Sequence, residues 1–285
     1  MYESFYGLHE KPFVMQPDPY FIYWSYGHRM AYSMLEYGII NAIGFTVITG
    51  EIGSGKTTLL RCLLAHMDET AVVGLLNSTR FEETELLQWV MMAFGQKFEN
   101  LSNVALFRDF QNFLVEQYSQ NRRVILVIDE AQNLNADILE QLRMLSNINT
   151  ETNQLLQIIL VGQPQLRQLL HAPQLRQFAQ RIGSDFHISS LSREEVEYYI
   201  EHRTKTAGAP NPLFTPEAAA IIAHASRGIP RLINLLCDTA LVYGYSLQAK
   251  VITSEIVEHV IAERFNYFTS GNVGENLALE THTKN

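Results

Sequence analysis

Short apolar runs alternate, up to about residue 190, with longer segments in which apolar residues recur every three or four positions. A short apolar run bounded by turn residues is typical of a strand buried on both faces of a parallel sheet. The predicted strands cover residues 45–49, 70–76, 124–128 and 155–161, and the predicted helices cover residues 28–40, 59–64, 82–94, 104–118, 135–146 and 166–179. Because strand and helix alternate, the pattern predicts a three-layer α/β domain with a mainly parallel sheet.

From Ser192 onward the pattern changes, and no further strand is evident. Ser192 and Glu195 have the spacing of a capping box at the start of a helix. Pro216 falls in the first turn of another helix, and Gly228 follows the end of that helix. The predicted helices cover residues 192–206, 215–227, 229–246 and 254–265. These segments predict a small all-α domain over residues 191–268.

A glycine-rich stretch joins the first predicted strand to the helix after it, and it matches G-x-x-x-x-G-K-[ST] at every position. Its glycines allow the backbone to curl round a phosphate chain with its N–H groups pointing inward. Lys56 can then reach the β- and γ-phosphates, Thr57 can ligate Mg²⁺, and the helix adds the positive end of its dipole. The predicted nucleotide-binding loop consists of Gly50, Glu51, Ile52, Gly53, Ser54, Gly55, Lys56, Thr57 and Thr58.

Two acidic residues, Asp129 and Glu130, directly follow the strand predicted at residues 124–128. Open parallel sheets bind ligands at the carboxyl ends of their strands, so both side chains are expected beside the phosphate loop. We predict that Asp129 holds Mg²⁺, commonly through water, and that Glu130 orients and deprotonates an attacking water. The phosphate loop before them supports this interpretation.

Three further polar residues are candidates for the same site, each with a simpler alternative. Gln163 follows the strand at residues 155–161 and could hydrogen-bond the γ-phosphate or its attacking water, or it could face solvent in a turn. Arg181 could be an arginine finger in the site of a neighbouring subunit, or it could belong to a solvated face with salt bridges. Arg231 begins a helix of the all-α domain and could report on the phosphates if that domain folds over them, or it could be a surface arginine.

The two ends of the chain differ in composition. Residues 1–40 begin with a stretch rich in aromatic residues and prolines, which is too broken for a long helix and too aromatic to stay solvated. We expect this segment to pack on the nucleotide-binding domain at residues 41–190, either as simple packing or as a wall of the adenine pocket. Residues 269–285 are polar and unpatterned, which predicts a disordered tail.

The overall composition restricts where the protein is expected to act and what it is expected to bind. The chain has 285 residues, of which 47% are hydrophobic, so a sizeable core is expected. A net charge of −9 disfavours nonspecific adhesion to nucleic acid or anionic lipid. Cys62 and Cys237 are far apart in predicted helices, which indicates buried thiols and a reducing cytoplasm. No signal sequence, apolar run of about 18 residues or metal-binding histidine spacing is visible.

With these residues in this order, the chain resembles an AAA+ ATPase. More narrowly, it resembles the general secretion pathway protein A family, the ExeA-type secretion ATPases, and relatives encoded with pilus and exopolysaccharide export systems. The resemblance covers about residues 1–265, and Asp-Glu-Ala-Gln-Asn-Leu at 129–134 with Gly-Gln-Pro at 162–164 is specific to this branch. The other segments that carry it are Phe5–Leu8, Lys11–Phe13, Pro17–Pro19, Thr49–Leu59, Arg176–Ile182 and Gly228–Arg231.

The resemblance implies a P-loop NTPase domain of AAA+ type followed by an α-helical lid, with ATP and Mg²⁺ bound and ATP hydrolysed to ADP and phosphate. It implies that a homo-oligomeric ring or filament drives or regulates assembly of a bacterial envelope export system. Longer family members continue into a transmembrane helix and a periplasmic peptidoglycan-binding region. This chain stops short of both, so we expect a cytoplasmic location, or a peripheral one at the inner membrane through a partner. Gln163 replaces the asparagine or threonine usual in AAA+ proteins, so hydrolysis could be slow.

Two other interpretations remain open. Transposition ATPases share the Asp-Glu-Ala-Gln and Gly-Gln-Pro pattern, which allows a DNA-linked regulator, although the acidic balance and the lack of a basic cluster argue against it. The third interpretation is a nucleotide-gated scaffold that binds ATP to assemble and hardly hydrolyses it. Single-turnover hydrolysis measured beside oligomer mass would separate a motor from a scaffold.

Overall fold

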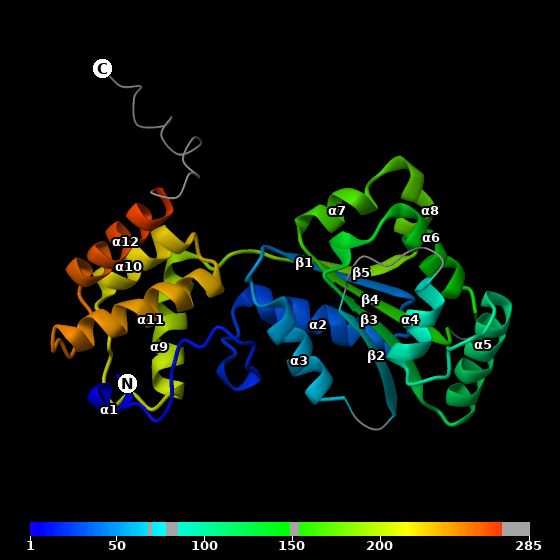
Figure 1. Ribbon diagram of the computed structural model, residues 1–285, viewed down its shortest axis with the longest axis horizontal. Coiled ribbons are helices and arrows are strands. Elements are labelled where there is room, and N and C mark those ends of the chain that lie inside the picture. Colours follow the sequence, from blue (N-terminus) through cyan, green and yellow to red (C-terminus); the bar gives the residue numbers. More distant parts are fainter. Residues whose placement is uncertain (68–69, 78–84, 149–153, 270–285) are drawn as a thin grey trace, which may run out of the picture. The chain divides into compact units, whose positions relative to one another are not determined.

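The computed structural model describes residues 1–67, 70–77, 85–148 and 154–269, with side chains described as far as residue 263. The chain divides into two compact units (Figure 1). One unit comprises Pro17–Ser189, and the other combines Met1–Gln16 with the chain from Ser190 onward. Within the described ranges, no helix combines the length and the apolar composition that crossing a membrane requires.

The unit of residues 17–189 is built on a five-stranded sheet with the strand order β2-β3-β4-β1-β5. All neighbouring strands run parallel, so their carboxyl ends share one edge of the sheet. The strands are β1 (Phe45–Gly50), β2 (Ala71–Asn77), β3 (Arg123–Asp129), β4 (Leu156–Gly162) and β5 (Ile182–Ile188). The predicted α/β fold with a mainly parallel sheet is confirmed.

Helices cover both faces of the sheet, because the central strands are apolar on both faces. Leu126 and Ile128 of β3 belong to one apolar cluster, whereas Ile125 and Val127 belong to the other. One face carries α2 (Tyr26–Ile40) and α3 (Lys56–Ala65). The other face carries α4 (Leu86–Ala93), α5 (Asn103–Ser119), α6 (Ala136–Leu145), α7 (Pro164–Leu170) and α8 (Arg176–Ala179). The short 3-10 turns of this unit are η1 (Pro19–Phe21), η3 (Ala131–Asn133) and η4 (Pro173–Leu175).

Strand β5 was not among the predicted strands. It is an edge strand beside β1, and its sequence Ile-Gly-Ser-Asp-Phe-His-Ile mixes polar and apolar residues. Only Ser184 and Ile188 are buried along it. An edge strand with one partner lacks the continuous apolar run by which β3 and β4 were predicted, so its pattern resembles that of a loop.

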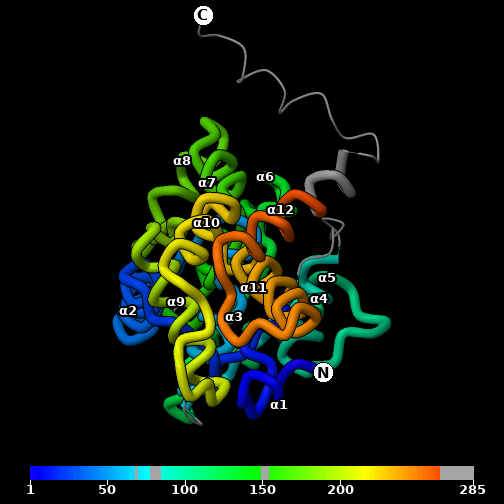
Figure 2. Tube along the Cα trace, turned by 90° about the vertical axis from the view of Figure 1, so that its left-hand side faces the viewer, coloured from blue at the N-terminus to red at the C-terminus, as the bar shows by residue number. Residues whose placement is uncertain are grey.

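The other unit is all-α after Ser190, as predicted for the carboxyl-terminal part. Its helices are α1 (Glu3–Tyr6), α9 (Arg193–Thr206), α10 (Pro216–Ser226), α11 (Pro230–Ser246) and α12 (Ser254–Thr269). The capping box is present, with the side chains of Ser192 and Glu195 each accepting a backbone N–H of the other. Helices α9 to α12 lie side by side in two perpendicular views (Figures 1 and 2).

Residues 1–16 belong to the helical unit, and this corrects the prediction that residues 1–40 pack as one segment on the nucleotide-binding domain. The Tyr6 hydroxyl donates to the backbone oxygens of Leu241 and Ala249, both at 3.2 Å. The Arg203 guanidinium donates to the Pro12 oxygen at 2.6 Å, and the Asn234 amide donates to the Val14 oxygen at 3.2 Å.

The physical reason for this placement is the burial of the aromatic side chains of the amino-terminal segment. Tyr2, Tyr6 and Phe13 are only 1%, 4% and 2% exposed, and Phe13 packs edge-on against Phe214. The faces that cover them come from helices far along the chain, which sequence pattern alone does not indicate. Residues 270–285, most of the predicted disordered tail, lie outside the described residues.

Candidate nucleotide site

The glycine-rich loop connects the carboxyl end of β1 to the start of α3. Gly55 caps α3 in the left-handed region at φ 94°, and Gly53 has φ 81°. A Cβ at Gly50 would lie 2.9 Å from the backbone oxygen of Ile188. The tight turn therefore requires glycine at these positions. The sequence of the loop thus selects a backbone that curls tightly between strand and helix.

Lys56 is the first residue of α3, and its side chain is only 7% exposed. Its Nζ donates to the backbone oxygens of Gly50 and Glu51, both at 2.8 Å. Burial lowers the pKa of the Lys56 ammonium, while the carboxylates of Glu130 and Asp129 act in the opposite direction. A buried cation therefore lies in the curl of the loop, facing the acidic residues at the end of β3.

Thr57 and Asp129 meet at the same edge of the sheet, although they are far apart in the sequence. The Thr57 hydroxyl donates to Asp129 Oδ2 at 3.1 Å, and Asp129 Oδ1 accepts the Glu130 N–H at 2.9 Å. A hydroxyl and a carboxylate side by side are the oxygen ligands that Mg²⁺ prefers, and Mg²⁺ commonly takes its other ligands from phosphates and water. The described residues hold no cluster of three metal-binding side chains, which such a phosphate-dependent site does not need. The residues fit the predicted metal.

Glu130 follows Asp129 in a left-handed backbone conformation, with φ 53°. Its Oε2 accepts hydrogen bonds from Gln132 Nε2 at 2.6 Å and from Gln163 Nε2 at 3.0 Å. The structure thus brings Gln163 to Glu130, rather than leaving it in a turn that faces solvent. Two amides hold one oxygen of the carboxylate that we predicted to activate water.

Gln132 is a member of this cluster that sequence reasoning did not select. Besides binding Glu130, its Oε1 accepts the backbone N–H of Gln163 at 2.9 Å. A Cβ at Gly162 would lie 3.0 Å from the same Oε1, so β4 ends in a glycine where Gln132 crosses it. The signal was present in the sequence, because Gln132 lies within the Asp-Glu-Ala-Gln motif two residues after Glu130.

Arg181 lies at the amino ends of the strands, whereas the phosphate loop lies at their carboxyl ends. It directly precedes β5, and Ile182 pairs with Phe45 at the start of β1, whereas Ile188 pairs with Gly50 at its end. Six strand residues span roughly 20 Å. The structure therefore does not bring Arg181 to Lys56 and Asp129 of the same chain.

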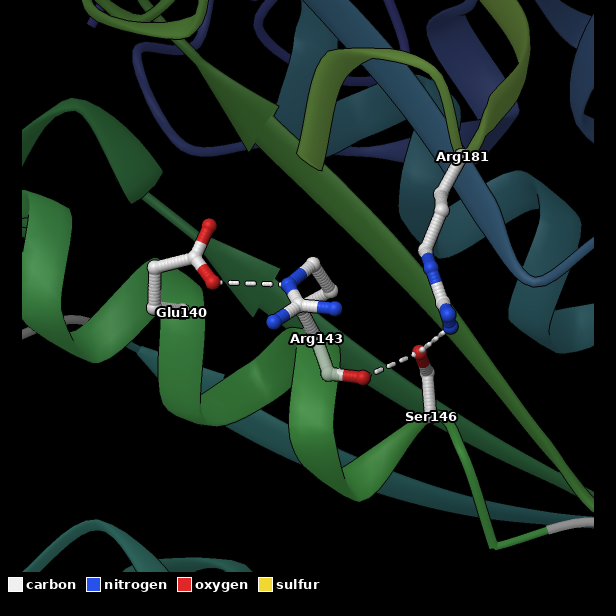
Figure 3. Close-up of polar contacts among 4 residues, drawn as sticks. All are labelled: Glu140, Arg143, Ser146 and Arg181. Atoms are coloured by element: carbon white, nitrogen blue, oxygen red, sulfur yellow. Dashed lines mark hydrogen bonds and ion pairs between the residues drawn. The ribbon is translucent and has the colours of Figure 1, made fainter. Parts of the chain in front are cut away.

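Arg181 instead joins a small polar group at the end of α6 (Figure 3). Its Nη1 donates to the Ser146 hydroxyl at 3.3 Å, and that hydroxyl donates to the backbone oxygen of Arg143 at 2.7 Å. Arg143 forms an ion pair with Glu140 at 2.7 Å. Arg181 is exposed. The side-chain partner described for it is a serine hydroxyl rather than a carboxylate.

Arg231 is the second residue of α11 and is exposed. It belongs to the helical unit, whereas the phosphate loop belongs to the unit of residues 17–189. Its predicted role at the phosphates therefore stays a prediction.

Comparison with known proteins agrees with this geometry. Residues 41–170 match the AAA domain family. The chain is 40% identical over 248 residues to general secretion pathway protein A of Aeromonas hydrophila, a match that covers 86% of this chain and 45% of the relative. The chain therefore spans less than half the length of that relative.

Solved structures show the same fold at low sequence identity. Cdc6p of Pyrobaculum aerophilum has a TM-score of 0.68 at 19% identity, over 90% of this chain and 72% of that one. ORC1 of Aeropyrum pernix in complex with DNA has a TM-score of 0.64 at 17% identity, over 90% and 69% of the two chains. A RuvB variant of Thermotoga maritima has a TM-score of 0.54 at 19% identity, over 85% and 70%. These likenesses support the fold of the P-loop NTPases.

Proposed function

We propose that this chain, which carries an AAA domain and is related to general secretion pathway protein A, binds ATP with Mg²⁺ and hydrolyses it. The observation that carries the proposal is the meeting of Lys56, Thr57 and Asp129 at the carboxyl edge of the parallel sheet. Phosphate loop, buried cation and metal-binding oxygens thus come together at the place where such sheets bind ligands.

The phosphates are held by the backbone N–H groups of residues 50–58 and by Lys56. Its Nζ now donates to two carbonyl oxygens of the loop, and a phosphate oxygen offers a stronger, charged acceptor in their place. Thr57 and Asp129 would hold Mg²⁺, which when bound neutralises charge on the phosphate oxygens. Arg231 is proposed to sense the phosphates within the same chain.

Glu130 is the proposed general base. Its Oε2 already accepts two amide hydrogen bonds, so Oε1 is the oxygen that would take a proton from the attacking water. Gln163 binds Glu130 and lies at the end of β4, from which its amide can also orient that water. The protonated carboxyl then returns its proton to the phosphate product or to solvent.

The wider proposal is that hydrolysis drives or regulates assembly of an envelope export system by a homo-oligomer. Its support is the relationship to a secretion protein and the exposed Arg181, which lies at the far edge of the sheet from its own site. An arginine in that position is too far from the phosphate loop of its own chain to act there, which supports a role in the site of a neighbouring subunit. We place the two described units in the cytoplasm, where ATP is available to the proposed site.

Substituting Lys56 tests the core of the proposal. Lys56→Ala is expected to weaken binding of fluorescent ATP by at least about 100-fold, because a charge-assisted contact to the phosphates is lost and the loop loses its internal cation. Lys205→Ala, on the exposed side of α9, is the matched control and should bind as the unchanged protein does. Equal ATP affinity in both variants would refute the proposed site.

The DNA-linked and scaffold alternatives are tested by measuring DNA binding, assembly and hydrolysis in the presence and absence of ATP. Two structures of the same fold are complexes with DNA, but their 17% identity to this chain supports the fold alone. ATP-dependent retention of duplex DNA, with affinity that falls steeply as salt rises, would favour a DNA-linked regulator. ATP-dependent assembly without single-turnover hydrolysis would favour a scaffold.

A further inference from the structure

His28, near the start of α2, is a buried residue that contacts the phosphate loop. Its side chain is 6% exposed, and Nε2 lies 2.9 Å from the backbone oxygen of Ser54. On its other side, Nδ1 lies 2.8 Å from the hydroxyl of Ser25, which caps α2. The imidazole therefore bridges a helix cap and the middle of the glycine-rich loop.

The hydrogen-bond partners determine which ring nitrogen carries the proton. A backbone carbonyl can only accept, so Nε2 must donate to the Ser54 oxygen. The Ser25 hydroxyl oxygen already accepts the backbone N–H of His28 at 3.2 Å, so its own hydrogen can point to Nδ1. Ser25 thus favours the tautomer in which Nε2 carries the proton and donates to the loop.

The hydrogen bond from His28 to the Ser54 oxygen fixes the orientation of the peptide unit between Ser54 and Gly55. In a trans peptide the carbonyl and the N–H point in opposite directions. With the Ser54 oxygen held toward His28, the Gly55 N–H points away from the imidazole. Gly55 has φ 94°, and a Cβ there would lie 2.8 Å from His28 Nε2, so the close approach requires glycine.

We propose that His28 is a positioning residue for phosphate binding, whose Nε2–H orients the Ser54–Gly55 peptide so that its N–H faces the phosphates. The inference rests on the proposed nucleotide site and adds a determinant outside the glycine-rich motif. The ligand concerned is the diphosphate part of a nucleotide, because the loop binds phosphates and not the base. His28 does not touch the reacting atoms.

Two amide substitutions separate hydrogen bonding from packing. Glutamine carries an N–H at the distance from the backbone where His28 has Nε2, so His28→Gln can still donate to the Ser54 oxygen. Asparagine carries its N–H nearer the backbone, where His28 has Nδ1, so His28→Asn cannot reach that oxygen. The two variants differ by one methylene group and are matched in polarity and charge.

The test is the dissociation constant of fluorescent ADP and of inorganic pyrophosphate for the full chain, measured beside the thermal midpoint of each variant. His28→Asn is expected to weaken binding of both ligands roughly tenfold, the effect of about one hydrogen bond, and His28→Gln to restore it to within about threefold. His171→Ala is the control for histidine loss, because His171 is exposed and its imidazole bonds to the Arg167 backbone oxygen one turn earlier.

The outcomes separate this inference from the proposed function. If the unchanged protein binds neither ligand, the nucleotide site itself is refuted, and His28 has no phosphate to serve. If the unchanged protein binds and all variants bind equally well, only the role of His28 is refuted. Equal weakening in His28→Gln and His28→Asn, with unchanged thermal midpoints, would also overturn it, because the donor position would then not matter.

Discussion

The carboxyl ends and the amino ends of the sheet strands form two edges, which differ in how firmly the chain holds the polar side chains there. At the carboxyl edge, the side chains of Lys56, Asp129 and Glu130 are wholly or partly buried and hydrogen-bonded to neighbours from other elements. At the amino edge, Arg181 is exposed and bonds only to a serine hydroxyl among the contacts described.

The phosphate-binding half of the site is therefore organised within one chain. A buried polar cluster costs free energy unless its members satisfy one another, so its geometry is held before any ligand arrives. Breaking the weak hydrogen bond of an exposed arginine costs little free energy. The amino edge is therefore suited to a contact that a second subunit completes, and substitutions at the two edges should have different effects.

Arg181→Ala should lower the ATPase rate by about 10³-fold while leaving ATP affinity nearly unchanged, if Arg181 acts across a subunit boundary. Mixing tests this most sharply. Arg181→Ala subunits keep an intact phosphate loop, and Lys56→Ala subunits keep an intact arginine, so a mixture should recover activity that neither variant has alone. A mixture as inactive as its components would assign Arg181 to a structural role at the end of α6.

Glu130→Gln should reduce turnover by about 10²- to 10³-fold and keep ATP binding, because the amide cannot accept the proton of water. The measurement is single-turnover hydrolysis together with the ATP dissociation constant. Glu116→Gln, on the exposed side of α5, serves as the matched substitution. A variant that hydrolyses at the normal rate would remove Glu130 from the mechanism.

Gln132→Ala should lower the maximal rate roughly tenfold without changing ATP affinity, because one hydrogen bond to Glu130 and one to the Gln163 backbone are lost. A structural role alone would lower the thermal midpoint and leave the rate per folded molecule unchanged. Rate and midpoint measured on the same sample distinguish the two. Gln120→Ala, at the exposed end of α5, is a suitable control.

Tyr6→Phe should produce the smallest effect, about 1 kcal/mol of unfolding free energy, because the hydroxyl hydrogen that two backbone oxygens share is lost from the helical unit. Burial raises the pKa of the Tyr6 hydroxyl to about 12. Its contribution to stability is therefore present below the ordinary tyrosine pKa of about 10 and is lost as pH rises through 12. Denaturant unfolding at several alkaline pH values should show a smaller decline in the variant.

Within the site, the sequence predicts the residues of local motifs but not the contacts between neighbouring strands. The phosphate loop and the Asp129–Glu130 pair were predicted at the residue level, because glycine spacing and a buried strand are local properties of the chain. Gln132 was missed even though it is two residues from Glu130. Its importance comes from Gln163, which a parallel neighbouring strand brings alongside it.

Local sequence pattern is enough to predict the alternation of strand and helix, the burial of β3 and β4 on both faces, and the tight loop before Lys56. Each of these depends on side chains close together in the chain. Only the tertiary structure placed residues 1–16 on the helical unit, added β5 at the edge, joined His28 to Ser54 and set Arg181 at the far edge. Those pairings bring together segments distant in sequence, and their free energy depends on shapes that exist only after the elements have packed.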